Sequence, residues 1–312
     1  MRLLLVASLL TGCVELGVIT DGTAVSKGRP SAGVLVDGLR LPDVGEGFAT
    51  RSPWKERGNR YGTDEMIDLI TGVGRRLATT VKGPRLIVAD LSARGGALAA
   101  KKWHRSHQNG RDVDLVYFMR DAEGKPMEAD AMRPFGPDLK AKDGSGISID
   151  VARTWALVKE LVTAPEATVQ WVFMYEPIAR KLLEHAVAEG EPEALIAKAR
   201  LALKQPGDSA PHHDHIHVRV YCNPNDVAQG CVNFGPMELW LARETERVEQ
   251  GDHPTIVASL ISGAANAGIS GSMLAETPAP VAGAAAATTA VSTPRDLTSL
   301  GRLLRAPIRR WR

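Results

Sequence analysis

The sequence of 312 residues has few aromatic residues, few cysteines and no long apolar run. No stretch reaches the roughly 18 consecutive apolar residues that a membrane-spanning helix needs. Aromatic residues make up 5% of the chain and the net charge is +2. Because no basic stripe interleaves with aromatic side chains, a nucleic-acid partner is not expected. The hydrophobic share of 44% is ordinary for a domain with a packed core.

The first thirteen residues differ in character from the rest. Arg2 precedes a short apolar stretch over 3–10, and small residues then lead into Cys13. This order is typical of a secretion signal. The four residues that end in Cys13 also resemble the lipobox of bacterial lipoproteins, in which the cysteine is lipidated and becomes the new N-terminus. The sequence therefore favours a signal peptide over 1–12 and a membrane-anchored periplasmic lipoprotein, with a buried first strand or helix as the alternative.

The two remaining cysteines are nine positions apart. Cys222 and Cys231 flank the turn-rich segment 223–226, which can fold back on itself. If Cys13 carries lipid, they form the even number that secreted proteins favour. They are too few to build a zinc site of their own at this spacing. A disulfide is predicted, with free thiols as the alternative.

Helical and strand patterns are mixed along the chain without a repeating strand-helix unit, which favours an α+β fold. After an irregular lead-in over 14–60, Thr63 is placed to cap a helix that runs to Leu77. Asp150 is placed to cap another. Further helices are expected around 178–186 and 192–203, and strands over 85–91, 112–119, 168–174 and 215–221.

The last part of the chain has a different composition. Residues 251–300 are dominated by Ala, Gly, Ser, Thr and Pro, which bury too little apolar surface to offset the entropy of ordering. The chain then ends in five arginines among a few apolar residues. Such an end could contact an anionic membrane or polymer, or be a solvated terminus without a role. We expect one domain over 13–250 followed by a low-complexity tail over 251–312.

Six of the eight histidines lie in two short segments, 104–114 and 212–217, beside acidic residues. Catalytic zinc takes three nitrogen or oxygen ligands and keeps one position open. Gly110 allows a tight turn between His107 and Asp114. His217 belongs to a strand pattern in which alternate residues share a face. These residues predict a site of two histidines and one carboxylate, without the His-Glu-x-x-His helix of another metalloprotease class.

The same residues resemble a known signature. Ser106-His107 through Gly110 to Asp114, followed by His215-Ile216-His217, is similar to zinc peptidases related to lysostaphin, D-Ala-D-Ala peptidases and the hedgehog domain. Within that group, segments 104–114 and 215–219 resemble the penicillin-insensitive murein endopeptidases. The lead-in segments 39–42, 45–48 and 60–63 also resemble the N-terminal region of that family. The resemblance covers roughly 25–245 and implies a small antiparallel sheet flanked by helices.

The resemblance also implies roles. His107, Asp114 and His217 match the family's zinc ligands. His215 matches a neighbour that stabilises the transition state or moves protons, and His212 matches a further active-site histidine. Between these two, His215 is our first choice as the general base.

Four other residues are less clearly placed. His104 matches a residue tied to the first cluster, with a second metal as one possible role. Asp150 corresponds to an outer metal ligand or, on local pattern alone, to a helix N-cap. His213 and Asp214 have no assigned counterpart.

The activity implied is zinc-dependent cleavage of D-alanine–meso-diaminopimelate cross-links in peptidoglycan. Two alternatives remain: a D,D-carboxypeptidase or D-Ala-D-Ala dipeptidase on the same fold, and a non-catalytic wall-binding module that contains zinc. A serine peptidase is not indicated, because the Ser52-x-x-Lys55 pattern lacks its partner motifs and Pro53 disfavours a helical Ser52.

Overall fold

The computed structural model describes residues 22–96, 104–207, 209–233, 235 and 239. The expected signal peptide, Cys13 and the tail over 251–312 lie outside the described residues. Among the helices of the described part, none combines the length and apolar character needed to cross a membrane. Helices and strands are mixed, as the sequence predicts.

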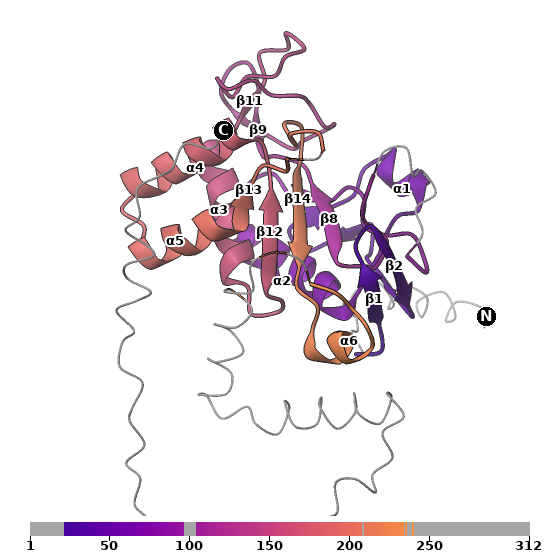
Figure 1. Ribbon diagram of the computed structural model, residues 1–312. Helices are drawn as coiled ribbons and strands as arrows, with labels where there is room; N and C mark the ends of the chain where they lie inside the picture. The colour runs from indigo at the N-terminus through magenta and orange to yellow at the C-terminus, as the bar shows by residue number, and fades with distance from the viewer. Residues whose placement is uncertain (1–21, 97–103, 208, 234, 236–238, 240–312) are drawn as a thin grey trace, which may run out of the picture. The chain divides into compact units, whose positions relative to one another are not determined.

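A four-stranded sheet forms the centre of the fold, in the order β13-β12-β14-β8 (Figure 1). The strands are β13 (Leu203–Lys204), β12 (Val169–Phe173), β14 (Ile216–Val220) and β8 (Asp112–Leu115). β14 pairs antiparallel with both β12 and β8, as expected. β13 instead pairs parallel with β12, so the sheet is mixed rather than purely antiparallel.

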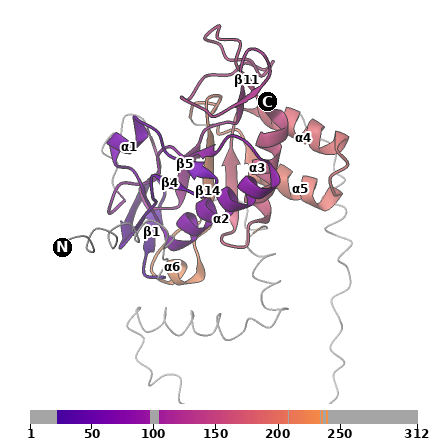
Figure 2. The same cartoon turned by 180° about the vertical axis from the view of Figure 1, so that it is seen from behind.

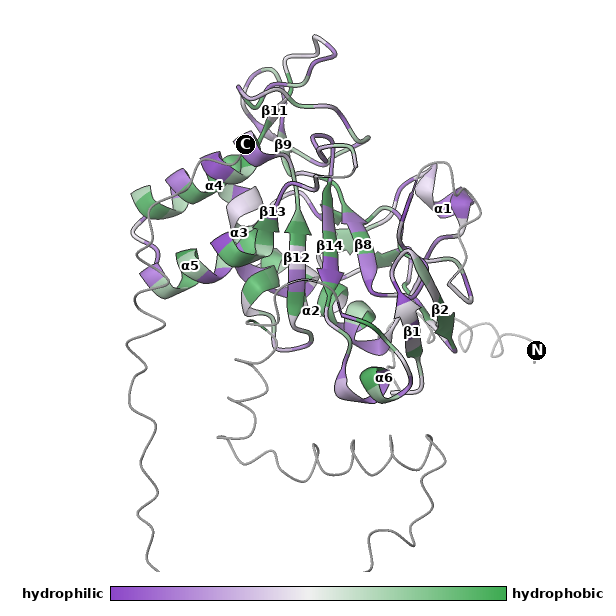
Figure 3. Ribbon diagram, in the orientation of Figure 1, coloured by the Kyte–Doolittle hydropathy of each residue, from purple (hydrophilic) through white to green (hydrophobic). Residues whose placement is uncertain are grey.

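The two faces of this sheet differ, because side chains alternate along each strand. Val172, Val218 and Val113 lie in one row of the register and are fully buried on the apolar face. The next row, Phe173, His217 and Asp114, lies on the opposite face. Figure 3 shows the resulting hydrophilic segments on β8 and β14. The apolar face therefore forms core, and the other face is left for polar side chains.

In the described part of the chain, four longer helices accompany the sheet: α2 (Asp64–Thr80), α3 (Val151–Thr163), α4 (Glu176–Ala188) and α5 (Glu193–Ala202). Seen from behind, α2 and α3 cross the back of the sheet (Figure 2). Thr63 caps α2 by accepting from the Met66 amide, and Asp150 caps α3 by accepting from the Arg153 amide. Both predicted caps are confirmed.

The segment before α2 is more regular than the expected lead-in. It contains the hairpin of β1 (Val25–Arg29) and β2 (Ala32–Val36), the short strands β3 (Leu39–Arg40), β4 (Val44–Gly45) and β5 (Phe48–Ala49), and one turn of helix, α1 (Trp54–Arg57). β3 pairs with β6 (Tyr61–Gly62), and β5 with β7 (Leu86–Ile87). Since most of these strands have two residues, no alternation is long enough to be recognised in the sequence.

Two predicted strands are shorter than expected. The strand expected over 85–91 reduces to β7, and the one over 112–119 divides into β8 and β9 (Met119–Arg120). Residues 116–118 between them are buried without belonging to a strand. Periodicity cannot separate a buried loop from a buried strand, because both are apolar runs. β9 pairs with β10 (Pro126–Met127) and β11 (Ser148–Ile149) in a separate small sheet.

The predicted disulfide between Cys222 and Cys231 is confirmed. It closes a loop that contains the short helix α6 (Pro224–Ala228). Gly28 on β1 bonds to this loop through its amide to Gly230 and through its carbonyl to Val232. The disulfide loop thus joins the end of β14 to the N-terminal hairpin.

Candidate metal centre

Three side chains from both histidine clusters converge at one end of β8 and β14. His217 and Asp114 are register partners on these strands, and His107 lies on the loop before β8. His107 Nε2 lies 3.2 Å from His217 Nδ1 and 3.2 Å from Asp114 Oδ1, and His217 Nδ1 lies 3.1 Å from Asp114 Oδ1. The structure therefore brings together the three residues that the sequence predicts as ligands.

The turn before β8 depends on a glycine. Gly110 has φ of 79°, and a Cβ added there would lie 2.7 Å from a Leu35 methyl carbon. Both conditions exclude larger residues. The tight turn expected between His107 and Asp114 is present.

The geometry of these atoms fits a small divalent cation. Zinc–nitrogen bonds of about 2.0–2.1 Å at tetrahedral angles separate neighbouring ligand atoms by about 3.3 Å. Both oxygens of Asp114 are fully buried and accept no hydrogen bond from the described residues. A buried, unpaired carboxylate is costly unless a cation neutralises it. Burial by itself raises the pKa of Asp114, but His107 and His215 hold it well below its usual range.

His107 is oriented by the loop around it. Its Nδ1 lies 3.2 Å from the carbonyl oxygen of Leu91, which leaves Nε2 directed toward Asp114 and His217. Its backbone has φ of 66°, in the left-handed region, and its amide donates to Asp112 Oδ2 at 3.0 Å. Carbonyl partners of this kind fix the tautomer of a metal-binding imidazole.

His217 lies beside Asp112, within ion-pair distance but without a hydrogen bond between the two. The distance from His217 Nε2 to Asp112 Oδ1 is 3.4 Å, so the other ring nitrogen, Nδ1, is left facing Asp114. Arg219 donates to both oxygens of Asp112, at 2.6 and 3.0 Å. Burial alone raises the pKa of Asp112, but Arg219 and His217 keep it well below its usual range. The sequence pattern contained Asp112 without giving it a role. Asp112 and Asp114 are two positions apart in a predicted strand, so their side chains share a face. That spacing is the signal that could have identified Asp112 as part of the site.

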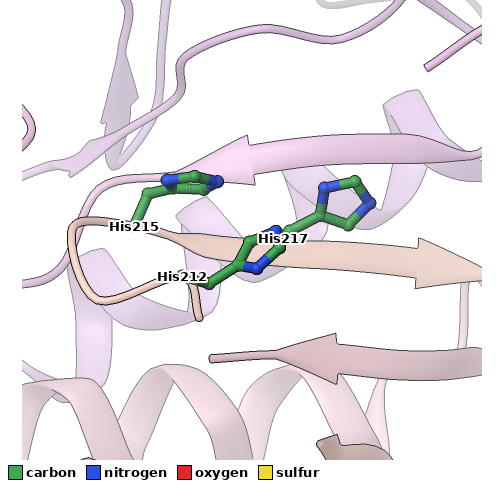
Figure 4. A group of neighbouring side chains, drawn as sticks. All are labelled: His212, His215 and His217. Carbon is green, nitrogen blue, oxygen red and sulfur yellow. The ribbon is translucent and has the colours of Figure 1, made fainter. Parts of the chain in front are cut away.

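His215 stands just before β14, on the same side as His217 (Figure 4). Its Nδ1 lies 2.8 Å from Asp214 Oδ1, and its Nε2 lies 3.5 Å from Asp114 Oδ1. Burial lowers the pKa of His215, but Asp114 and Asp214 outweigh it and raise the pKa above the ordinary value. Asp214 therefore has a structural role that the sequence left unassigned.

His212 completes the group of histidines shown in Figure 4. Its ring centroid lies 4.8 Å from that of His215, and it stacks on Phe173 at 6.1 Å. Its Nδ1 lies 2.8 Å from the carbonyl oxygen of Ala210. Desolvation, together with the neighbouring His217 and His215, lowers the pKa of His212 to about 3. The surroundings therefore shift the pKa values of His212 and His215 in opposite directions.

A comparison with protein families gives one match that spans most of the described residues. The family model of the penicillin-insensitive murein endopeptidases matches residues 26–239. The chain belongs to this family. No curated protein sequence matches the chain. Family membership makes the protein a peptidase that acts on peptidoglycan, and the buried histidines and aspartates of this endopeptidase could hold a metal ion.

His104 of the endopeptidase connects the centre to a carboxylate that sequence reasoning missed. His104 Nε2 lies 3.0 Å from Asp90 Oδ2, and its Nδ1 lies 3.6 Å from Asp114 Oδ2. Asp90 is buried and accepts a 2.6 Å bond from Arg57. Burial raises the pKa of Asp90, but His104 and Arg57 lower it below the ordinary value despite nearby Asp114. Nothing local in the sequence marks Asp90, because it follows an apolar run far from either cluster.

Two other residues lie apart from the convergent atoms. Asp150 caps α3 and pairs with Arg153 at 2.8 Å and Arg120 at 3.1 Å. It is in none of the possible metal-binding groups of the described residues. His213 contacts the ring of Tyr175 edge-on at 6.4 Å. The structure therefore gives Asp150 the N-cap role that its local pattern indicated.

Other combinations of the endopeptidase's side chains could also hold an ion. Ligand atoms lie within 4.8 Å of one another in three groups: His212, His215 and His217; His104, His107 and Asp114; and His107, Asp112 and His217. Asp112 is already bound by Arg219 and by the His107 amide. The set of His107, Asp114 and His217 is not one of these three groups, but its ligand atoms lie 3.1–3.2 Å apart and the oxygens of its carboxylate accept no hydrogen bond from the described residues.

Proposed function

We propose that this protein is a zinc-dependent endopeptidase, with His107, Asp114 and His217 as the zinc ligands. The observation that supports this most strongly is the near-equilateral arrangement of their three ligand atoms, with sides of 3.1–3.2 Å. Two histidines and one carboxylate form a ligand set that catalytic zinc commonly uses. Zinc held there would supply Lewis-acid chemistry for hydrolysis of an amide bond.

His215 is the proposed general base and acid. Because Asp214 holds its Nδ1, the proton transferred during catalysis would be at Nε2, the nitrogen that faces Asp114. A raised pKa lets the same ring take up a proton and return it to the leaving amine. His212 is the second choice, because its lowered pKa makes it a weak proton acceptor.

The proposed substrate bond joins D-alanine of one stem peptide to meso-diaminopimelate of its neighbour, as the family resemblance implies. The fold proposed with it is the hedgehog and D-Ala-D-Ala peptidase type. The experiment is digestion of purified sacculi, followed by identification of the released muropeptides. Conversion of dimers to monomers, lost with a chelator and restored by zinc, is expected. Release of free D-alanine alone would instead identify a carboxypeptidase, and binding without cleavage would identify a wall-binding module.

We also propose that Cys13 carries lipid and attaches the enzyme to a membrane in the periplasm. The sequence pattern before Cys13 supports this proposal, and a cell-wall substrate is compatible with it. A second acyl chain is what makes such an anchor stable, because one chain alone binds membranes only weakly. Incorporation of radiolabelled palmitate should occur in the wild type and be absent in Cys13→Ser.

A further inference from the structure

The polar face of the central sheet continues past the metal centre toward the β13 edge. Lys204 on β13 is the register partner of Phe173 on β12, and Phe173 is the partner of His217 on β14. Side chains of such partners lie on one face of a sheet. The Phe173 ring lies 5.4 Å from the His217 ring in an edge-on contact. One row therefore runs from Asp114 through His217 and Phe173 to Lys204.

Lys204 lies over an aromatic side chain at the end of this row. Its Nζ is 4.5 Å from the centre of the Trp171 ring, and Trp171 lies 5.8 Å from Phe173. A cation over an indole ring is held in place without being neutralised. The position of the Lys204 charge is therefore set by the fold, although the residue is exposed.

The charge of Lys204 has no carboxylate partner among the described residues. Arg219, the cation closer to the centre on this face, differs because Asp112 neutralises it through two hydrogen bonds. The centre itself is rich in carboxylates. An anionic group of a substrate would meet its available positive charge at Lys204, beyond the half-buried Phe173 and beside the buried Trp171.

The spacing of the row sets where that anionic group would be. Neighbouring strands are about 4.8 Å apart, so the backbones of Lys204 and His217 are separated by about 10 Å. An extended peptide advances about 3.3 Å per residue. A carboxylate two or three residues from the cleaved bond would reach Lys204. In a cross-linked stem peptide, the free C-terminal carboxylate lies about this far from the cross-link.

We propose that Lys204, held in place by Trp171 and lying beyond Phe173, forms a subsite that binds the C-terminal carboxylate of a stem peptide. This inference rests on the proposed endopeptidase function, because it assumes that the substrate crosses the metal centre. The subsite makes a free C-terminus a determinant of substrate choice. Amidation of that carboxylate should weaken binding, since the charge that Lys204 recognises is removed.

The test compares two ligands and three variants in the zinc-loaded protein. The ligands are a D-alanine–diaminopimelate cross-linked dimer with a free C-terminus and the same dimer with that terminus amidated. Lys204→Met should raise KM for the dimer with a free C-terminus about fivefold without changing kcat. The KM for the amidated dimer should stay the same. Lys204→Arg should retain most of the preference for the free dimer. Lys82→Met, an equal change at an exposed lysine that follows α2, is the matched control.

A binding measurement separates failure of this inference from failure of the proposed function. The monomeric tetrapeptide stem and its C-terminal amide contain no cross-link, so calorimetry reports their affinity whether or not the protein cleaves dimers. Tighter binding of the free acid by the wild type, lost in Lys204→Met, supports the subsite. Equal binding of acid and amide by the wild type, or an unchanged difference in Lys204→Met, overturns it.

Discussion

His217 lies between two aspartates of the same strand, with Asp112 on its Nε2 side and Asp114 on its Nδ1 side. The first aspartate is bound by Arg219 and the second has unused oxygens. In the proposed zinc site, Asp112 would therefore orient the imidazole and Asp114 would bind the ion. Two carboxylates two positions apart on β8 therefore have different proposed roles, although their side chains are chemically identical.

Replacing the orienting carboxylate should weaken metal binding. Asp112→Asn keeps the size of the side chain but removes the charge beside His217 and Arg219. We expect zinc affinity to fall about 10- to 100-fold, the usual effect of losing a partner that orients a metal ligand. Competition with a chromogenic chelator measures this affinity. Chemical denaturation of the metal-free protein is the control, because Asp112→Asn also loses part of its bond to Arg219.

Replacing a proposed ligand should abolish cleavage rather than weaken it. His107→Ala and Asp114→Ala each leave two ligands, so bound zinc and release of monomers from sacculi should both fall to background. Inhibition by a β-lactam is not expected, because no acylatable serine takes part. The control is Asp150→Asn, which should alter stability but leave bound zinc unchanged. Wild-type zinc content in Asp114→Ala would contradict the ligand assignment.

The two candidate bases should differ in their effect on rate. His215→Ala should lower kcat by about 10²- to 10⁴-fold, the range for loss of general acid–base catalysis, while zinc stays bound. His212→Ala should have a smaller effect. Asp214→Asn should lower kcat less than His215→Ala, because it only loosens the bond that holds Nδ1. Single-turnover rates and zinc content of each variant test this order, and a larger loss in His212→Ala than in His215→Ala would reverse the assignment.

A buried carboxylate away from the centre should make stability depend on pH. Asp226 in α6 is buried, and burial together with Glu65 raises its pKa from 3.8 to about 8. Between about pH 4 and pH 8, the folded protein therefore keeps a proton on Asp226 that the unfolded chain has already lost. Its stabilising contribution is complete below pH 4 and is lost as pH rises through that window.

Asp226→Asn should remove this dependence, because an amide does not ionise. We expect the variant to match the wild type near pH 4 and to be more stable by at least about 1 kcal/mol at pH 8. Urea unfolding across this pH range measures the difference. Glu123→Gln, the same chemical change at an exposed turn, is the control. A wild-type slope that persists in full in Asp226→Asn would exclude Asp226 as its source.

The disulfide should contribute measurably to stability. It closes a loop between residues nine positions apart, and loops of this size correspond to about 2–3 kcal/mol in the chain-entropy account. The double variant Cys222→Ser, Cys231→Ser should lose about this much. Urea unfolding of the variant and of the wild type, each with and without reductant, tests it. An equal effect of reductant on both proteins would contradict the prediction.

The sequence by itself predicted the longer elements and the three proposed ligands. The helices capped by Thr63 and Asp150, and the strands that became β12 and β14, follow from caps and periodicity, which act over a few residues. The residues of the centre were found because they are grouped in two short segments. Their grouping is local, so it can be seen without the fold.

The tertiary structure alone decided which side chains surround those residues. Asp112 and Arg219 are 107 positions apart, and His107 and His217 are 110 apart, so no local pattern can pair them. Asp90, the orientation of His215 by Asp214, and the row from Asp114 to Lys204 also depend on strand register. Register is set by burial of one face of the sheet, and that burial exists only once distant segments have packed together.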